Sequence, residues 1–487
     1  MSDRARLRLQ KRQCHRDRVQ GTAWQICVKG RFIESEVRGI LEKRTVAACT
    51  IIFSILFGAP GLTGCQYPDI RVQESEPLIE NWLAYKAQVE DDQPFAEERD
   101  TETIVRPESV EPAEKETEEA EETEATADDA QLAQEEAKWE AIQQSKREGK
   151  AEAFKRQHGF YYSYLSDSAK VVYDEILSGL QERKETTIST LSDTQADMAF
   201  QCVLYDHPEI FYVSGYHLTQ KTLDGQVVEL SVTGQYEYTQ EEAEERKAKI
   251  DAYVSECLAG VPDTDDEYLK VKYVFDYLIT HTAYNLNAPD NQNICSVFIG
   301  GESVCQGYAE SAQYLLRELG IESAIVTGLV NGGGRHAWNL VRVNDRYYYM
   351  DVTWGDVDYR ATDNEQEDKL VPVNYDYFLV TTTQLEKSHV IETIVTMPDC
   401  VSEEDNYYVR EGLYFEEVDE QQLASAFAGA YDRGQTTVTL KGTDGAVFEQ
   451  LKHYLLDENH IFEYVDALES ISYSEDTNMY TICFWLS

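Results

Sequence analysis

Basic side chains are scarce in this 487-residue sequence. It holds 43 Lys and Arg against 90 Asp and Glu, which gives a formal net charge of −47 at pH 7. A surface with so large an excess of negative charge repels the phosphates of DNA and RNA, so nucleic acid is excluded as a partner. The imbalance is uneven, because residues 1–44 carry a net charge of +7 and the remainder carries −54.

Cysteine is also sparse, with ten residues in the whole chain. This number is too low for a disulfide framework, and no CxxC pair or histidine cluster has the spacing of a zinc site. The acidic stretch at residues 356–368 lacks the central Gly and the fixed spacing of a calcium-binding EF-hand loop. We therefore predict no metal site and no cofactor. Apart from Cys305, five cysteines follow residue 65, and we expect most of them to be buried and reduced. These are Cys202, Cys257, Cys295, Cys400 and Cys483.

The sequence has no uninterrupted apolar run of about 20 residues, the length that a transmembrane helix needs. The apolar run at residues 46–57 is followed directly by Gly-Ala-Pro-Gly, so a transmembrane helix is the less favoured interpretation. A short basic start, this run and the Leu-Thr-Gly-Cys sequence at residues 62–65 are together typical of a secretory signal. The tetrapeptide resembles the lipobox of bacterial lipoproteins, which implies that Cys65 is lipidated and becomes the mature N-terminus.

One cysteine stands at the start of a predicted helix. In SVCQGYAESAQYLLRELG, residues 303–320, apolar residues recur at steps of three and four from Cys305 onward. Ser303 and Gln306 fit a capping box, and Gly320 fits the glycine that ends a helix. Because helix N-termini favour cysteine thiolates, Cys305 is a candidate nucleophile, and the alternative is an inert buried thiol.

Two strands joined by a tight turn follow this helix. Residues 332–356 have the sequence GGGRHAWNLVRVNDRYYYMDVTWGD. Two runs typical of strands lie on either side of a turn at Asn-Asp, residues 344–345. With a two-residue turn, His336 and Asp351 lie on one face as diagonal neighbours, about 7 Å apart between α-carbons. The carboxylate can then accept a hydrogen bond from one imidazole nitrogen and leave the other free to take a proton. The alternative is an ordinary core histidine, and a slip of one residue would move His336 to the other face.

The three motifs together resemble a known family. Cys-Gln-Gly-Tyr at a helix start, His-Ala-Trp-Asn on one strand and Asp-Val-Thr-Trp on the next resemble the core of the transglutaminase-like superfamily, a branch of the papain-like thiol enzymes. The resemblance covers roughly residues 263–400 and includes NYDYFLVTTTQLEKSH after the third motif. It implies an α+β fold in which a helix bearing the cysteine packs on an antiparallel sheet bearing the histidine and the aspartate.

The resemblance also implies roles for individual residues. Cys305 would be the nucleophile, His336 the general base and acid, and Asp351 the residue that orients His336. Substrate-binding residues expected from the same motifs are Trp338, Tyr308 and Trp354. The implied activity is acyl transfer from amide bonds of protein or peptide substrates through a Cys thioester, by transamidation, deamidation or hydrolysis. The alternatives are a cysteine peptidase of the same fold and a non-catalytic cell-surface binding module.

The chain divides into six expected segments. These are a basic leader at 1–44, a lipoprotein signal peptide at 45–65, an acidic disordered tether at 66–150, an α+β accessory domain at 151–262, the transglutaminase-like domain at 263–400 and a small α+β domain at 401–487. The leader is long for a signal peptide, so translation is hypothesised to start near Leu41. The expected location is the outer face of a bacterial cytoplasmic membrane, with a lipid anchor.

Overall fold

The computed structural model describes residues 70–74, 98–106, 159–356, 358–361, 373–465 and 468–486. The expected leader, the signal peptide with Cys65 and most of the expected tether lie outside these residues. Among the described residues, no helix combines the length and the apolar character that crossing a membrane requires.

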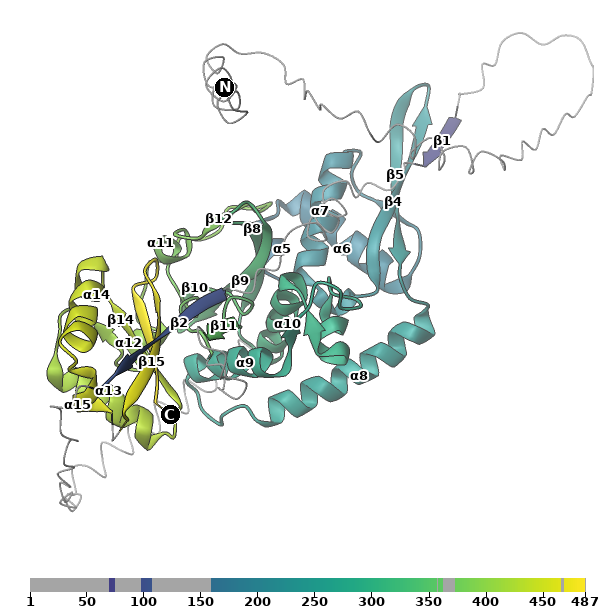
Figure 1. Ribbon diagram of the computed structural model, residues 1–487. Helices are drawn as coiled ribbons and strands as arrows, with labels where there is room; N and C mark the ends of the chain where they lie inside the picture. Colours follow the sequence, from purple (N-terminus) through teal and green to yellow (C-terminus); the bar gives the residue numbers. More distant parts are fainter. Residues whose placement is uncertain are drawn as a thin grey trace, which may run out of the picture. The chain divides into compact units, whose positions relative to one another are not determined.

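An antiparallel sheet in the order β1-β4-β5-β3 forms the accessory domain (Figure 1). Its strands are β1 Ile70–Glu74, β3 Thr186–Ile188, β4 Val213–Leu223 and β5 Gln226–Tyr236. The helices of this part are α5 Phe160–Tyr164, α6 Asp167–Glu182 and α7 Asp193–Asp206, and a short 3-10 helix follows at Pro208–Ile210. Helices and an antiparallel sheet therefore occur together in this part of the chain.

Two helices lead from the accessory domain into the core. Helix α8, Gln240–Ala259, begins at Thr239, whose side chain and that of Glu242 form a capping box. Helix α9, Glu267–His281, begins at Asp266, whose carboxylate accepts the backbone N–H of Tyr268. Each cap satisfies backbone donors that have no partner inside the helix, which fixes where the helix starts.

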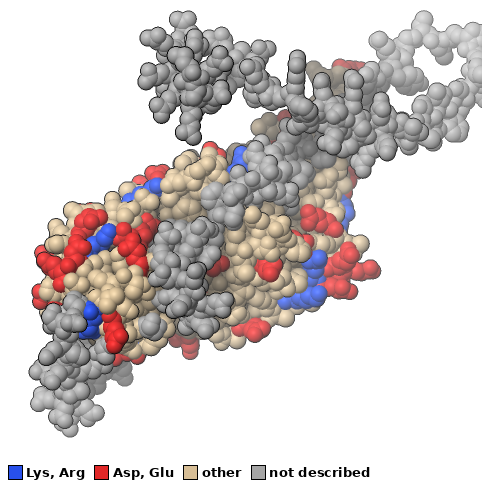
Figure 2. Space-filling view, in the orientation of Figure 1, with Lys and Arg blue, Asp and Glu red and all other residues tan. Residues whose placement is uncertain are grey.

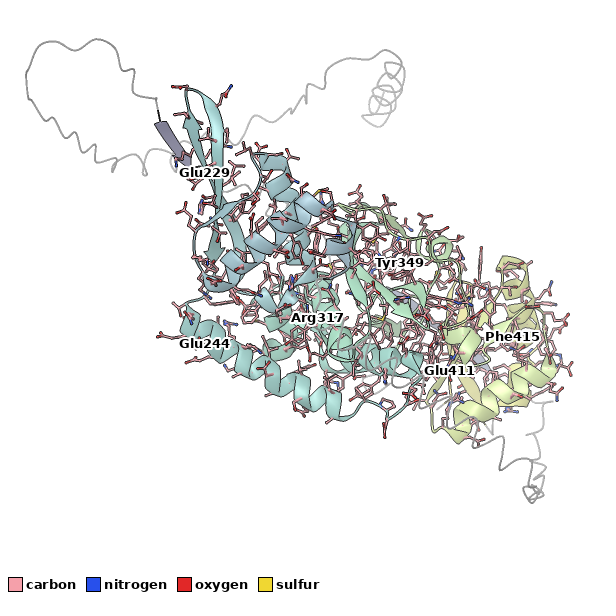
Figure 3. The ribbon with its side chains drawn as sticks, turned by 180° about the vertical axis from the view of Figure 1, so that it is seen from behind. Glu229, Glu244, Arg317, Tyr349, Glu411 and Phe415 are labelled. Atoms are coloured by element: carbon pink, nitrogen blue, oxygen red, sulfur yellow. The ribbon has the colours of Figure 1, made fainter. Side chains whose placement is uncertain are left out.

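The core carries helix α10, Cys305–Glu318, on an antiparallel sheet in the order β10-β9-β8-β12. The sheet strands are β8 Ser323–Val330, β9 Arg335–Val343, β10 Arg346–Met350 and β12 His389–Ile391. The remaining core elements are β6 Ala283–Tyr284, a π-helical turn at Ser296–Gly300, β7 Glu302–Ser303 and α11 Thr382–Leu385. Figure 3 labels Arg317 near the end of α10 and Tyr349 on β10. This is the helix-on-sheet arrangement that the resemblance implies.

Arg317 joins α10 to the accessory domain. Its guanidinium donates to the backbone oxygen of Asp206 at 3.0 Å and to a carboxylate oxygen of Glu209 at 2.5 Å. Both acceptors lie at the end of the accessory helices, so a two-point contact fixes the far end of α10.

The C-terminal part forms a six-stranded sheet in the order β11-β2-β15-β16-β14-β13. Its strands are β2 Glu98–Val105, β11 Asp358–Ala361, β13 Tyr414–Phe415, β14 Thr437–Gly442, β15 Ser470–Asp476 and β16 Thr481–Trp485. Its helices are α12 Tyr407–Arg410, α13 Glu420–Asp432, α14 Gly445–Lys452 and α15 Ile461–Tyr464, with a π-helical turn at His453–Asp457. Acidic side chains outnumber basic ones on the face of the molecule in Figure 2.

Two strands correct the expectation of a disordered tether over the whole of 66–150. The segment Glu98–Val105 pairs antiparallel with β15, with Ile104 opposite Ile471, and the Thr103 hydroxyl lies 3.1 Å from that of Ser472. The segment Ile70–Glu74 pairs antiparallel with β4. Thr101 and Thr103 alternate with Asp100 and Glu102 in β2, a pattern that favours a strand, but the acidic residues around it obscure the pattern.

A buried carboxylate fastens the C-terminal part to the core. Asp376 accepts hydrogen bonds from the Tyr408 hydroxyl at 2.7 Å and from the Thr481 hydroxyl at 2.9 Å. Since a buried carboxylate without partners is strongly unfavourable, these bonds favour one docked arrangement.

Candidate functional site

The β9–β10 hairpin has the register that the sequence predicts. Val343 pairs with Arg346, and both turn residues, Asn344 and Asp345, have positive φ values of 49° and 64°. Two such residues are the requirement of a type I′ turn, whose twist matches that of the flanking strands. The register places the start of β9 beside the residue that follows β10, which is Asp351.

Helix α10 starts differently from the prediction. Cys305 is its first residue, but the N-cap is Val304, which offers no side-chain hydrogen bond. The predicted capping box is wrong because its two members have other partners. The Ser303 hydroxyl lies 2.6 Å from that of Ser296, and the Gln306 amide donates to Glu310 at 2.8 Å.

The helix ends as predicted. Gly320 has a φ of 76°, a value that a side chain disfavours, and the N–H of Ile321 donates to the oxygen of Leu316 at 2.9 Å. This is the Schellman arrangement of a helix C-terminus.

His336 and Asp351 form a buried pair. The Nε2 atom of His336 lies 2.6 Å from Oδ2 of Asp351, and the other carboxylate oxygen accepts the backbone N–H of Trp354 at 3.1 Å. Cys305, His336 and Asp351 are at most 2% exposed. The predicted neighbourhood of His336 and Asp351 is therefore confirmed, and Nδ1 of His336 remains for a different partner.

The charge of Cys305 acts on the same imidazole. Burial disfavours the charged imidazolium of His336, but the charges of Asp351 and Cys305 and hydrogen bonds to both side chains outweigh it and raise its pKa to about 10. Burial would raise the pKa of Asp351, yet the charge of His336 and hydrogen bonds from two histidines hold it below its ordinary value. The structure therefore favours an imidazolium against an ionised carboxylate at neutral pH.

A second histidine, His389, contacts the carboxylate of Asp351. The sequence alone did not indicate this residue. The Nε2 atom of His389, the first residue of β12, lies 3.1 Å from the same Oδ2 of Asp351. Its Nδ1 atom lies 2.8 Å from the Ser388 hydroxyl, which lies 2.9 Å from that of Tyr377. Burial is the main cause that lowers the pKa of His389, so this ring is neutral where His336 is charged. His389 closes the quoted stretch NYDYFLVTTTQLEKSH, but only the pairing of β12 with β8 shows where its side chain points.

The His336–Asp351–His389 cluster has the composition of a metal site, since one ligand atom of each residue lies within 4.8 Å of the others. The two contacts to Asp351, at 2.6 and 3.1 Å, are hydrogen-bond separations. A proton between each ring and the carboxylate accounts for them, and we interpret the cluster as a proton-sharing network.

The three residues expected to bind substrate occupy different environments. Trp338 is fully buried and stacks on His336, with ring centroids 5.9 Å apart. Tyr308 is also fully buried and donates to the backbone oxygen of Thr282. Trp354 is 9% exposed and packs against both histidines of the site. Substrate contact stays a prediction for all three, and burial does not favour it for Trp338 and Tyr308.

Tyr284 is a further residue that the sequence analysis missed. It lies on β6, where its backbone pairs with Ser303, and its ring packs on Val304, the residue before Cys305. Burial raises the pKa of Tyr284, and the charges of Cys305 and Asp351 raise it further. Tyr284 is therefore a neutral phenol on the strand that pairs with the segment leading to Cys305.

Comparison with known proteins agrees with this geometry. A family model described as the transglutaminase-like superfamily matches residues 229–352, which include Cys305, His336 and Asp351 and end before His389. No curated protein matches the chain.

Solved structures with detectable likeness are distant. One described as a TGase is 17% identical, covers 33% of this chain and 46% of its own, and has a TM-score of 0.21. A protein from Cytophaga hutchinsonii, provisionally described as a cysteine protease, is 16% identical and has a TM-score of 0.20. This match covers 29% of the present chain and 58% of the Cytophaga protein. The periplasmic domain of TgpA from Pseudomonas aeruginosa is 16% identical and has a TM-score of 0.18. This match covers 28% of the present chain and 59% of the TgpA domain. The chain spans about half the length of these structures. The chain therefore contains a transglutaminase-like domain, which the family model matches over residues 229–352.

Proposed function

We propose that this chain is a thiol enzyme that transfers acyl groups from amide bonds of proteins or peptides. The observation that carries the proposal is the buried pair of His336 and Asp351, whose side chains lie 2.6 Å apart. Cys305 is buried at the start of α10, the helix that contacts the strand of His336. An imidazolium held by a carboxylate stabilises a neighbouring thiolate, and the thiolate is the nucleophilic form of cysteine.

The proposed reaction has two halves. The Cys305 thiolate attacks the carbonyl carbon of a carboxamide, and the tetrahedral intermediate collapses to a thioester as Nδ1 of His336 protonates the leaving amine. His336 then takes a proton from an incoming amine or water, which attacks the thioester and releases Cys305. Asp351 keeps the imidazole oriented through both halves.

The tetrahedral oxyanion needs hydrogen-bond donors. The backbone N–H of Cys305 lies in the first turn of α10 and has no acceptor within the helix, so it is the first donor that we assign. The hydroxyl of Tyr284 is the second, because its strand runs beside Ser303 and its ring packs on Val304. Removing one such donor in other acyl-transfer enzymes costs about 10² to 10³ in rate.

We further propose that the enzyme acts outside the cytoplasm, attached to the bacterial membrane by a lipid on Cys65. The basic start, the apolar run and the Leu-Thr-Gly-Cys sequence at residues 62–65 support this location. The excess of basic residues at 1–44 agrees with a leader that stays on the inner side of the membrane.

Selective labelling of cysteines tests the proposal. Burial raises the pKa of Cys202, Cys257, Cys295 and Cys400 to about 12. These four thiols are therefore internal controls that should react slowly at pH 7, whereas Cys305 should be labelled by iodoacetamide at least about tenfold faster. Site-resolved mass spectrometry measures each rate. Equal slow labelling of Cys305 would favour the non-catalytic binding module.

A second assay separates the enzyme classes. Incorporation of a fluorescent primary amine into a glutamine-containing protein indicates transamidation. Release of ammonia without incorporation indicates deamidation. Cleavage of the peptide backbone without either indicates the peptidase alternative, which uses the same nucleophile and water.

A further inference from the structure

His389 lies outside the residues that the family model matches, yet it contacts the central carboxylate of the site. We propose that His389 is a positioning residue, a neutral hydrogen-bond donor that fixes Oδ2 of Asp351 toward His336. This inference rests on the proposed function of Cys305 for its kinetic consequence, but its structural part concerns Asp351 alone.

The hydrogen bonds around His389 define where its proton lies. Asp351 is ionised, so its Oδ2 can only accept, and the 3.1 Å contact requires a proton on Nε2 of His389. A neutral imidazole then leaves Nδ1 as an acceptor, and the Ser388 hydroxyl, 2.8 Å away, is its donor. The chain of donors runs from Ser388 to His389 to Asp351.

Both histidines converge on one oxygen atom. His336 lies 2.6 Å and His389 3.1 Å from Oδ2 of Asp351, while the other oxygen accepts the N–H of Trp354. A carboxylate with all three donors in place cannot rotate without losing at least one charge-assisted bond. His389 is almost fully buried, so no water replaces its donor if the ring is removed.

The fold brings His389 to this point through β12. That strand pairs antiparallel with β8, with His389 opposite Val330. On the other side of β8, Gly328 pairs with His336 of β9. The two histidines therefore come from strands that flank β8, and the sheet itself sets their separation.

Three variants of the full-length chain test the inference. His389→Leu removes the donor and keeps an apolar side chain. His389→Gln keeps an N–H near the position of Nε2. Ile391→Ala, in the same strand, is the matched control, because it weakens the packing of β12 without touching these hydrogen bonds.

Two measurements are made on each variant. One is the rate of Cys305 alkylation at pH 6. The other is the proton resonance of the His336 Nε2–H in histidine-labelled protein, which reports the hydrogen bond to Asp351 directly. We expect His389→Leu to slow alkylation about tenfold and to move the resonance upfield, because Asp351 is no longer held toward His336 and the hydrogen bond between them weakens. His389→Gln should stay within about twofold, and Ile391→Ala should lower only the unfolding temperature.

The outcomes separate the possible failures. If His389→Leu is alkylated at the wild-type rate and its His336 resonance does not move, the inference is overturned. If the alkylation rate falls equally in the Leu and Gln variants, His389 acts through packing alone, and the inference is overturned as well. If His389→Leu does not fold, Ser388→Ala replaces it, and unchanged histidine resonances in that variant contradict the proposed donor chain. If wild-type Cys305 is unreactive, the proposed function fails, while the resonance of His336 still decides the role of His389.

Discussion

Gly328 of β8 lies so close to Val390 of β12 that a Cβ atom on the glycine would stand 2.0 Å from the Val390 carbonyl oxygen. It would also lie 2.8 Å from the ring of Trp338. The absent side chain therefore allows β12 to pair with β8 and carries His389 to Asp351.

Gly328→Ala should displace β12 and destabilise the protein by about 1–3 kcal/mol, the usual cost of forcing extra volume into a packed core. Urea unfolding measures the loss, and the His336 resonance should move as in His389→Leu. Gly332→Ala is the control for the loss of a glycine in the neighbouring turn, where no heavy atom lies within 4 Å of the new Cβ but the φ of 101° adds backbone strain. A Gly328→Ala variant with normal stability and an unmoved resonance would contradict the account of β12.

Cys305→Ala should abolish selective labelling and turnover and leave the fold intact, because it removes a single sulfur atom at a helix end. Residual activity above about a thousandth of the wild-type rate would argue against a nucleophile, since loss of a triad nucleophile costs more. Cys400→Ala, which removes another buried free thiol, should retain full activity.

Asp351→Asn should preserve the shape of the site and remove its charge. Without the carboxylate, burial dominates the environment of His336 and its pKa falls, so the imidazolium that supports the thiolate is lost. We expect the alkylation of Cys305 at pH 6 to slow by about 10² to 10³, less than the roughly 10⁴ of a serine triad because a thiol ionises more easily. Asp345→Asn, the same change at the exposed hairpin turn, should have no effect. Superimposable pH profiles of wild type and Asp351→Asn would remove Asp351 from the triad.

Stability should depend on pH through His336. Its pKa is raised in the folded protein to about 10, so the stability that its charge contributes is fully present below about pH 6.5 and is lost as pH rises through 10. A single proton limits this slope to about 1.4 kcal/mol per pH unit. Urea unfolding between pH 6.5 and 10.5 should show the decline in wild type and a flatter curve in Asp351→Asn. Parallel curves would mean that the pair does not hold the proton.

Cys65→Ser should release the protein from the membrane fraction if the signal is a lipobox. Cys49→Ser, within the apolar run of the same segment, is the matched control and should remain anchored. A Cys65→Ser protein that stays in the membrane with its leader uncleaved would support the transmembrane alternative instead.

The sequence predicts those parts of the site whose residues are close together along the chain. His336 and Asp351 are joined by a two-residue turn, so alternation alone places them together. The capping box of Thr239 and Glu242 is equally local, because both residues lie at the first turn of α8. The same rule failed at Ser303, because Ser296, seven residues earlier, competes for its hydroxyl.

The parts that escaped prediction depend on long-range pairing. His389 reaches Asp351 only through the register of β12 on β8, and nothing within its own stretch reveals that register. Strand β2 pairs with β15 across more than 360 residues of sequence, and its acidic composition hides its alternation. In both cases the decisive contact is made by backbone groups, which every residue carries.

If Cys65 carries the proposed lipid, the position of β1 limits the distance between the protein and the membrane. Ile70 begins a strand of the accessory sheet only five residues after Cys65, and five extended residues span about 17 Å. A coil of the length first expected for the tether would reach about 50 Å. With a lipid on Cys65, as proposed above, Ile70 would therefore lie within about 17 Å of the membrane surface. Under that proposal, the substrates within reach would be those embedded in the membrane or lying against its surface.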